Sequence, residues 1–434
     1  MAVTKNVLPS DGAVTPSHDR RAEVLILLVL SFANGLVALD RLAVNFLSPY
    51  IVADLGLSNS QLGLVASALS LAISVSGLIL SAVADASGKR KRMLILALLV
   101  FSLLSAGSGL ATGFATLAIA RLLLGAGEGP VVPLAQAIMA EASDPRRRGL
   151  NMGAMQICGA FLIGAVLGPP LAVGVAERFG WQSAFFLTGV PGVVAVVLIA
   201  WVVPRDNSAA RPRPDRPRRR QGQRQDIAVL LRTPNLLLSM AIAGLFTGWL
   251  MIQNIFMPLY LVRVDGFSTA QMSVVLSASG VGGVLGGVLI PALSDRLGRR
   301  PVLVATCFAG LAAPAAMLFI HGSVPLLAVA MGVSWLVMGC APLVCAIVPG
   351  ESVAPERITT AVALAMSAAE VVGGVLIPPI AGWIADRHGL ESVFVMALGG
   401  ALLCGILAMF LGETAPRVLA RKGQRSALAQ STPS

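Results

Sequence analysis

The stretch VLILLVLSFANGLVALDRLAVNF, residues 24–46, decides the class of fold. It is apolar and 23 residues long, and about 20 such residues suffice to cross a bilayer as a helix. It nevertheless contains Asp40 and Arg41, and a second apolar run contains Arg121 and Glu128. A charge at the centre of a membrane helix costs about 2.5–3.5 kcal/mol, so four unpaired charges would cost on the order of 10–14 kcal/mol. We therefore expect these four side chains to pair with one another or to line a wet cavity.

The composition excludes an ordinary soluble protein. Of 434 residues, 56% are hydrophobic and 12% are charged, against roughly 25% charged residues in soluble domains, and the mean hydropathy is +0.83. The five cysteines show no metal-ligand spacing, so we expect buried thiols and no metal ion or cofactor. No catalytic constellation accompanies the buried charges, which argues against an enzyme.

Twelve apolar runs of spanning length predict an all-α membrane protein with twelve transmembrane helices. A long polar break divides them into two sets of six, which places both ends of the chain on one side of the membrane. The helices are expected near residues 24–46, 61–83, 93–113, 114–140, 150–174, 183–203, 235–261, 270–293, 302–320, 324–348, 359–384 and 392–412.

Lys and Arg residues are unevenly divided between the two sets of loops. Twenty-seven lie in the tails, the central break and the loops on that side, whereas three lie in the opposite loops. Because cytoplasmic loops are enriched in Lys and Arg, both termini are predicted to be cytoplasmic, in a bacterial inner membrane. The net charge of +11 then reflects topology and not nucleic-acid binding. The predicted parts are an N-terminal tail (1–22), a six-helix bundle (23–204), an Arg/Pro-rich linker (205–234), a second six-helix bundle (235–412) and a C-terminal tail (413–434).

The two halves of the chain also resemble each other in sequence. Two separate stretches match at nearly the same offset, and parallel six-helix repeats of this kind place a substrate site at their interface, near the membrane midplane. At an offset of 210, Gly77, Asp85, Gly88, Lys89 and Arg90 match Gly287, Asp295, Gly298, Arg299 and Arg300. At an offset of 209, Gly164, Pro169, Pro170 and Glu177 match Gly373, Pro378, Pro379 and Asp386.

The loop after the second helix of each half combines an Asp, a glycine turn and a basic cluster, in residues 77–91 and 287–300. These loops resemble the signature loop of the major facilitator superfamily, and the resemblance spans the whole chain. It implies a transporter that alternates access between two parallel six-helix repeats, with a gate latch formed by the loops. The alternative is that the charges only set topology. The first copy has Ala86 where the family usually has Arg, which implies a weaker latch. The expected gate residues are Gly77, Asp85, Gly88, Lys89, Arg90, Asp295, Arg296, Gly298, Arg299 and Arg300.

Within the superfamily, Asp40-Arg41 and the stretch RLLLGAGEGP (residues 121–130) resemble the anion:cation symporter family. Spinster-like lysolipid transporters share the pattern. Ala38 and Gly129 stand where Tyr and Ala are common in this group, so the substrate stays open. In helical geometry Asp40 points about 100° away from Arg41. Arg41 can therefore face a cavity while Asp40 faces a neighbouring helix, where Arg121 is its expected partner.

The resulting hypothesis is proton-coupled uptake of a small organic anion such as a carboxylate or sugar acid. Protons would bind to the carboxylates within apolar spans, and the anion to an arginine and nearby amides. The predicted proton-coupling residues are Asp40, Glu128 and Glu370, and the predicted substrate-binding residues are Arg41, Arg121, Asn34, Gln156 and Asn254. Glu370 has a helix-packing role as an equal alternative.

Other functions stay open from the sequence alone. A Spinster-like transporter of lysolipids or amphiphiles is the second hypothesis. A drug/proton antiporter is the third. Residues 164–170 resemble the core of the antiporter motif of drug exporters, but we interpret this stretch as a bendable packing helix in preference to an exporter signature. A membrane receptor would leave the repeated loops unexplained. Symport or antiport, and proton or sodium coupling, are not decided. The expected partners are the substrate, protons and the lipid bilayer, and the chain is expected to act as a monomer.

Overall fold

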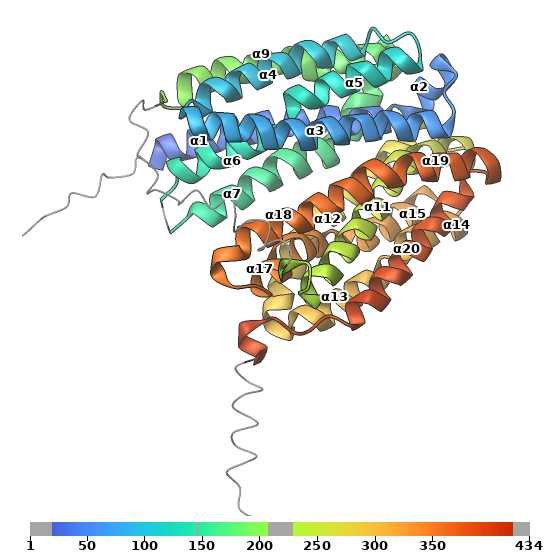
Figure 1. The fold of residues 1–434 in the computed structure, drawn as a ribbon. Coiled ribbons are helices and arrows are strands. Elements are labelled where there is room, and N and C mark those ends of the chain that lie inside the picture. The colour runs from blue at the N-terminus through green and yellow to red at the C-terminus, as the bar shows by residue number, and fades with distance from the viewer. Residues whose placement is uncertain (1–19, 145, 207–228, 420–434) are drawn as a thin grey trace, which may run out of the picture.

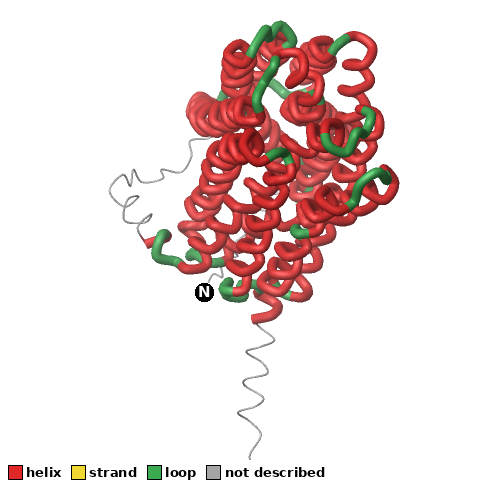
Figure 2. The backbone as a smooth tube through the Cα atoms, turned by 90° about the vertical axis from the view of Figure 1, so that its right-hand side faces the viewer, coloured by secondary structure: helices red, strands yellow, loops and turns green. Residues whose placement is uncertain are grey.

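The structure is a computed structural model that describes residues 20–144, 146–206 and 229–419. Most of the expected tails and of the expected linker therefore lies outside the described residues. Within them, the regular structure is entirely helical (Figure 2). Twelve helices or runs of helices are long and apolar enough to cross a membrane, as predicted.

The first half contains six of these spans. They are α1 (Arg20–Phe46); α3 (Asn59–Ser87); α4 (Arg90–Ser108); α5 (Phe114–Glu128) with α6 (Val131–Ala142); α7 (Arg148–Gln156) with η1 (Ile157–Leu167) and α8 (Gly168–Phe179); and α9 (Trp181–Val202). A short helix that the sequence analysis did not predict, α2 (Ser48–Leu55), follows α1.

The second half contains the other six spans. They are α11 (Pro234–Arg263); α12 (Thr269–Leu297); α13 (Arg299–Ala309) with α14 (Ala312–Phe319); α15 (Val324–Ser334) with η2 (Trp335–Gly339), α16 (Cys340–Pro342), η3 (Leu343–Ile347) and α17 (Val348–Glu351); α18 (Ile358–Ala368) with η5 (Ala369–Leu376) and α19 (Ile377–His388); and α20 (Glu391–Met409). The short helix η4 (Pro355–Arg357) precedes α18.

The structure differs from the sequence prediction in the end of one span and in the helix type of two others. The third span ends at Ser108, five residues before the expected end, because Gly109 begins a turn that leads to α5. The fifth and eleventh spans are not regular α-helices, since each contains a π-helical segment, η1 or η5. These segments end at Leu167 and Leu376, which are 209 residues apart and thus equivalent in the repeat.

Each half forms one bundle, and the two bundles meet along α3 with α19 and along α12 with η1 and α8. Figure 1 shows the first half in blue and green above the second half in yellow and red. We call the side from which both described ends emerge the terminal face and the opposite side the far face. The bundles are in contact toward the far face, whereas α7 and α18 diverge toward the terminal face (Figure 1).

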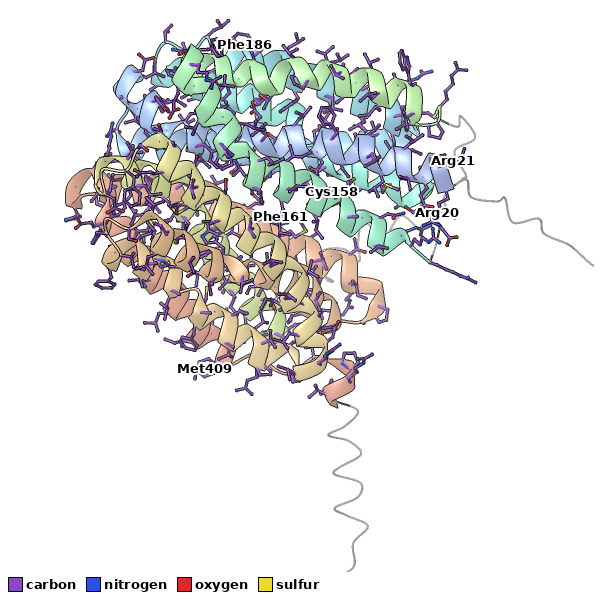
Figure 3. All side chains as sticks on the ribbon, turned by 180° about the vertical axis from the view of Figure 1, so that it is seen from behind. Arg20, Arg21, Cys158, Phe161, Phe186 and Met409 are labelled. Carbon is purple, nitrogen blue, oxygen red and sulfur yellow. The ribbon has the colours of Figure 1, made fainter. Side chains whose placement is uncertain are left out.

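The outer surface of the bundles is apolar, as lipid contact requires. Trp201, Leu103 and Val190 are 81%, 72% and 64% exposed. Phe186 and Met409 also point outward from the bundles (Figure 3). Such a surface would aggregate in water, so the solvent that it fits is the hydrocarbon of a bilayer.

Small residues let α5 lie close to α3. A Cβ atom on Gly125 would come within 2.7 Å of the Leu69 carbonyl oxygen. The Ser76 hydroxyl donates a hydrogen bond to the Gly125 carbonyl oxygen at 3.1 Å. Contacts of this kind between small residues are typical of membrane helices. They fix the helix that carries Arg121 and Glu128.

Candidate functional site

The first pair of buried charges is Asp40 and Arg121. Asp40 Oδ2 lies 2.8 Å from Arg121 Nη1, and the two side chains are 0% and 1% exposed. The pair joins α1 to α5 inside the first bundle, as the helical geometry of the sequence predicted. Removal of either partner of such a buried pair would leave the other charge buried and uncompensated, which is strongly destabilising.

Asp40 is further held by two hydroxyl groups that the sequence analysis missed. Its Oδ1 atom accepts hydrogen bonds from Ser105 of α4 and, at 3.0 Å, from Thr188 of α9. Asp40 thus connects α1 to three other helices. The signal for Ser105 was present in the sequence, because Ser102, Ser105 and Ser108 lie three residues apart and so share one helical face.

Arg121 is enclosed by protein. Its guanidinium carbon lies 4.6 Å from the centre of the Phe185 ring, a cation–π contact. Its Nε and Nη2 atoms have no hydrogen-bond partner among the described residues. The sequence analysis expected Arg121 to bind substrate. In this conformation its side chain is 1% exposed and pairs with Asp40, so substrate contact by Arg121 stays a prediction.

The second pair is Arg41 and Glu128. Glu128 Oε1 accepts from Arg41 Nε at 2.7 Å and lies 2.5 Å from Arg41 Nη2. The Glu128 side chain is 0% exposed, whereas the Arg41 side chain is 43% exposed. Of the four charges, Arg41 is therefore the one that a ligand can reach. Glu128 Oε2 has no hydrogen-bond partner within the described part of the chain.

Glu370 approaches this group from the second half. It lies at the start of η5, is exposed, and is close enough to Arg41 for electrostatic interaction. A Cβ atom on Gly374 would lie 2.9 Å from Glu370 Oε2 and 3.4 Å from the hydroxyl of Ser70 on α3. The Glu370 carboxylate thus sits at the interface between the two halves.

The predicted amide residues occupy two places. Asn34 Nδ2 donates to Gln156 Oε1 at 2.6 Å, which joins α1 to the residue before η1. Asn254 is half-buried on α11, and its neighbour Gln253 is fully buried with no partner for its amide atoms among the described residues. The structure therefore brings Asn34 and Gln156 together and places Asn254 on the opposite half.

Each charged loop at the terminal face forms ion pairs with residues of its own half. Arg90 pairs with Asp85 at 2.7 Å and also with Glu141. In the second half, Arg299 pairs with Asp295 at 2.6 Å and with Glu351 at 2.9 Å. The repeat in sequence is thus a repeat in structure. A latch between the halves formed by these loops stays a prediction.

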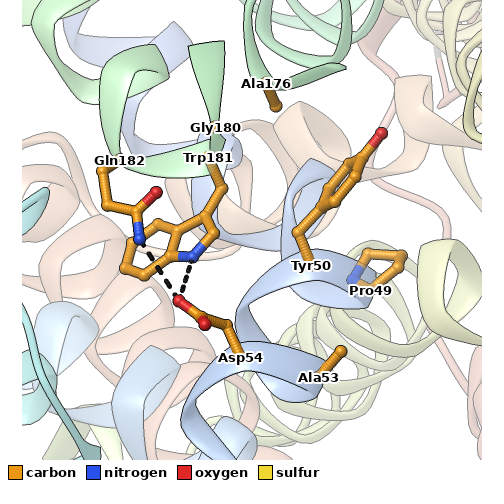
Figure 4. A pocket seen from close by; sticks show the side chains of 8 residues that line it. All are labelled: Pro49, Tyr50, Ala53, Asp54, Ala176, Gly180, Trp181 and Gln182. Atoms are coloured by element: carbon orange, nitrogen blue, oxygen red, sulfur yellow. Dashed lines mark hydrogen bonds between the residues drawn. The ribbon is translucent and has the colours of Figure 1, made fainter. Parts of the chain in front are cut away.

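A separate pocket of about 460 Å³ opens on the far face between α2 and the start of α9. Asp54 accepts from the indole nitrogen of Trp181 at 2.8 Å and from the Gln182 amide at 3.2 Å (Figure 4). Tyr50 and Pro49 line the other side. These bonds hold α2 against α9 and are separate from the four charges.

Comparison with known proteins fits this architecture. The sequence profile of the Major Facilitator Superfamily matches residues 30–349 and again residues 252–433. The chain belongs to the major facilitator superfamily. The protein is thus a transporter-family member and not an enzyme.

Several bacterial transporters are similar to this chain along most of their length. The hexuronate transporter of Bacillus subtilis is 28% identical over 406 residues, 89% of this chain and 92% of that protein. The sulfoacetate transporter assigned in Cupriavidus necator is 25% identical over 88% of this chain and 92% of that protein. The 3-(3-hydroxy-phenyl)propionate transporter of Escherichia coli is 30% identical over 66% of this chain and 68% of that protein.

Solved structures confirm the fold. A bacterial homologue of the human lysosomal transporter Spinster, in an inward-facing conformation, has a TM-score of 0.73 at 16% identity, covering 90% of this chain and 97% of that one. The D-xylose–proton symporter has a TM-score of 0.70 at 19% identity, covering 90% of this chain and 98% of that one. At these identities the likeness shows the major facilitator fold alone.

Proposed function

We propose that this superfamily member takes up a small organic anion together with protons and that Arg41 binds the anion. The observation that carries the proposal is the difference in exposure among the four charged side chains of α1 and α5. Asp40, Arg121 and Glu128 are 0–1% exposed, whereas Arg41 is 43% exposed. Arginine binds carboxylates through two parallel hydrogen bonds and keeps its charge in an apolar site.

The relatives support an anionic substrate. The hexuronate, hydroxyphenylpropionate and sulfoacetate transporters are all named for organic acids. The segregation of Lys and Arg supports a cytoplasmic terminal face. With that orientation, the two bundles are in contact on the outer side of the membrane, whereas α7 and α18 diverge toward the cytoplasm (Figure 1). This is the arrangement expected after substrate has entered from outside.

Glu128 is proposed as the residue that couples the proton to the anion. While ionised, it occupies two nitrogens of Arg41 and so competes with a substrate carboxylate. A proton on Glu128 weakens this pair and frees the guanidinium. Proton and anion then enter together, and the site gains no net charge. This keeps the loaded site compatible with the apolar membrane interior.

Asp40 and Glu370 take supporting parts in this proposal. Asp40 bonds Arg121, Ser105 and Thr188, so its protonation would loosen four helices at once and link the proton to movement within the bundle. Glu370 faces Arg41 from the second half. It is a third candidate for proton binding.

The amides are proposed to select the rest of the substrate. Asn34 and Gln156 lie on the half that carries Arg41, and Asn254 lies on the other half. Amide side chains both donate and accept hydrogen bonds, which suits the hydroxyl groups of a sugar acid or a phenolic acid. A substrate bonded to residues of both halves would stabilise conformations in which the two halves lie close together around it.

Binding measurements test the role of Arg41. The purified transporter is titrated with a hexuronate, 3-(3-hydroxyphenyl)propionate and sulfoacetate, and with the neutral amide of each acid that binds. We expect an acid to bind and its amide to bind at least tenfold more weakly. Arg41→Lys should weaken acid binding about tenfold, because the ammonium lacks the planar fork of nitrogens.

The control is Arg263→Ala, which removes an exposed arginine at the end of α11 and should leave binding unchanged. An acid that binds equally well to the wild type and to Arg41→Ala would contradict the proposal.

A further inference from the structure

The two bundles meet along two equivalent seams. In the first seam, α3 packs on η5 and α19, and the Ser67 hydroxyl donates to the Val375 carbonyl oxygen at 2.8 Å. In the second seam, α12 packs on η1 and α8, and the Ser277 hydroxyl donates to the Val166 carbonyl oxygen at 2.8 Å. The serines are 210 residues apart and the valines 209, so the two hydrogen bonds are related by the repeat.

Each seam ends at the far face with a carboxylate that reaches across to the other half. Asp386, near the end of α19, accepts from the backbone N–H groups of Asn59 at 2.8 Å and Ser60 at 2.9 Å, and from the Ser60 hydroxyl. Its repeat equivalent, Glu177 of α8, accepts from the hydroxyl of Thr269. Both carboxylates thus bond the first turn of a helix in the opposite bundle.

The bonds to Asp386 complete the N-terminus of α3. The first N–H groups of a helix have no partner within the helix itself. Ser58 caps α3 and accepts from Gln61 N, which leaves the N–H groups of Asn59 and Ser60 for Asp386. A carboxylate at this end of a helix is also favoured by the helix dipole. Separation of the halves would leave these two N–H groups without the carboxylate that accepts from them.

The two seams differ in their bonds at the far face. Gly382 lies against the backbone of Asn59, with which a Cβ atom on Gly382 would collide. The equivalent residue in the other seam is Val173, which is buried. Asp386 accepts from two backbone N–H groups and a hydroxyl, whereas the longer Glu177 accepts from a side-chain hydroxyl.

We infer that Asp386 is the principal latch that holds the far face closed in the empty transporter, with Glu177 as a weaker, repeat-related counterpart. Alternating access requires the halves to separate at the far face, and these bonds must then break. The strength of the Asp386 latch therefore sets the resting balance between the two conformations. This inference concerns the empty protein and does not depend on the proposed substrate.

Distance measurement by pulsed electron paramagnetic resonance tests the latch without any substrate. Spin labels are attached to cysteines introduced at Thr112 and Val264, exposed residues of the two halves on the far face, in a chain with the exposed Cys158 replaced by Ser. In liposomes, Asp386→Asn should raise the ratio of the longer to the shorter distance population five- to tenfold. Glu177→Gln should raise it less than threefold.

The control is Glu391→Gln, an exposed carboxylate at the start of α20 in the same half as Asp386. It should leave the distances unchanged. Gly382→Ala should shift them in the same direction as Asp386→Asn by pushing the seam apart, which provides a second test if one variant folds poorly. A wild-type distribution in both Asp386→Asn and Gly382→Ala would overturn the inference, as would an equal shift in Glu391→Gln.

Discussion

Replacement of Glu128 by Gln is the most informative change to the site. Glu128 Oε1 holds Arg41 Nε at 2.7 Å and Nη2 at 2.5 Å. Hydrogen bonds to charged groups contribute about 1.5–3 kcal/mol, and exposure of 43% of the Arg41 side chain reduces the pair to about 1–2 kcal/mol. Glutamine removes this competitor for the guanidinium. The variant should therefore bind the anionic substrate about 5–30-fold more tightly.

The same variant should lose its response to protons. Glutamine at position 128 leaves Arg41 without the titratable carboxylate that pairs with it. An imposed pH gradient should therefore no longer drive accumulation, while exchange of labelled for unlabelled substrate should persist. Both are measured in proteoliposomes, with binding measured on the same preparation and Glu391→Gln as the control. Weaker binding by Glu128→Gln, together with normal pH-driven accumulation, would refute the reasoning.

Three further changes probe other parts of the structure. Asp40→Asn should destabilise the protein by about 3–5 kcal/mol, because it leaves Arg121 buried without its counter-charge; an unchanged melting temperature would contradict this. Ser105→Ala, which removes one bond to Asp40, should cost about 1–2 kcal/mol in the same assay. Protonated His321 on the far face donates from Nδ1 to Asp265, and this hydrogen bond raises the pKa of His321. The pair therefore stabilises the fold fully below pH ~6.5 and loses its effect as pH rises through the raised pKa. His321→Gln should remove that part of the pH dependence of the melting temperature.

Much of the fold could be predicted because the bilayer restricts what a chain can do. Spanning length alone gave twelve helices, and the matched offsets gave the two repeats, since an apolar run in lipid must satisfy its backbone as a helix. The π-helical segments η1 and η5 could not be predicted. They depend on how α1 and α11 pack against these segments and not on local composition. The helix α2 was missed for the same reason, since its place is fixed by contacts such as Asp54 to Trp181.

The charged site was predicted in part. The 100° step between Asp40 and Arg41 predicted that they face different neighbours and that Asp40 pairs with Arg121. Which arginine is exposed could not be read from the sequence, because this depends on the position of Phe185 over Arg121. The serine face of α4 is visible in the sequence, but Ser105 and Thr188 lie 65 and 148 residues from Asp40, and local patterns do not report which side chain they contact.

The central claim is that proton binding and anion binding are coupled at Arg41 and Glu128. It is tested most directly by uptake of labelled organic acids into proteoliposomes, with and without an imposed pH gradient that is acidic outside. We predict that a gradient drives accumulation of one or more acids above the equilibrium level and that Glu128→Gln abolishes this accumulation. Wild-type accumulation that is the same with and without the pH gradient would contradict the account, as would gradient-driven accumulation in Glu128→Gln.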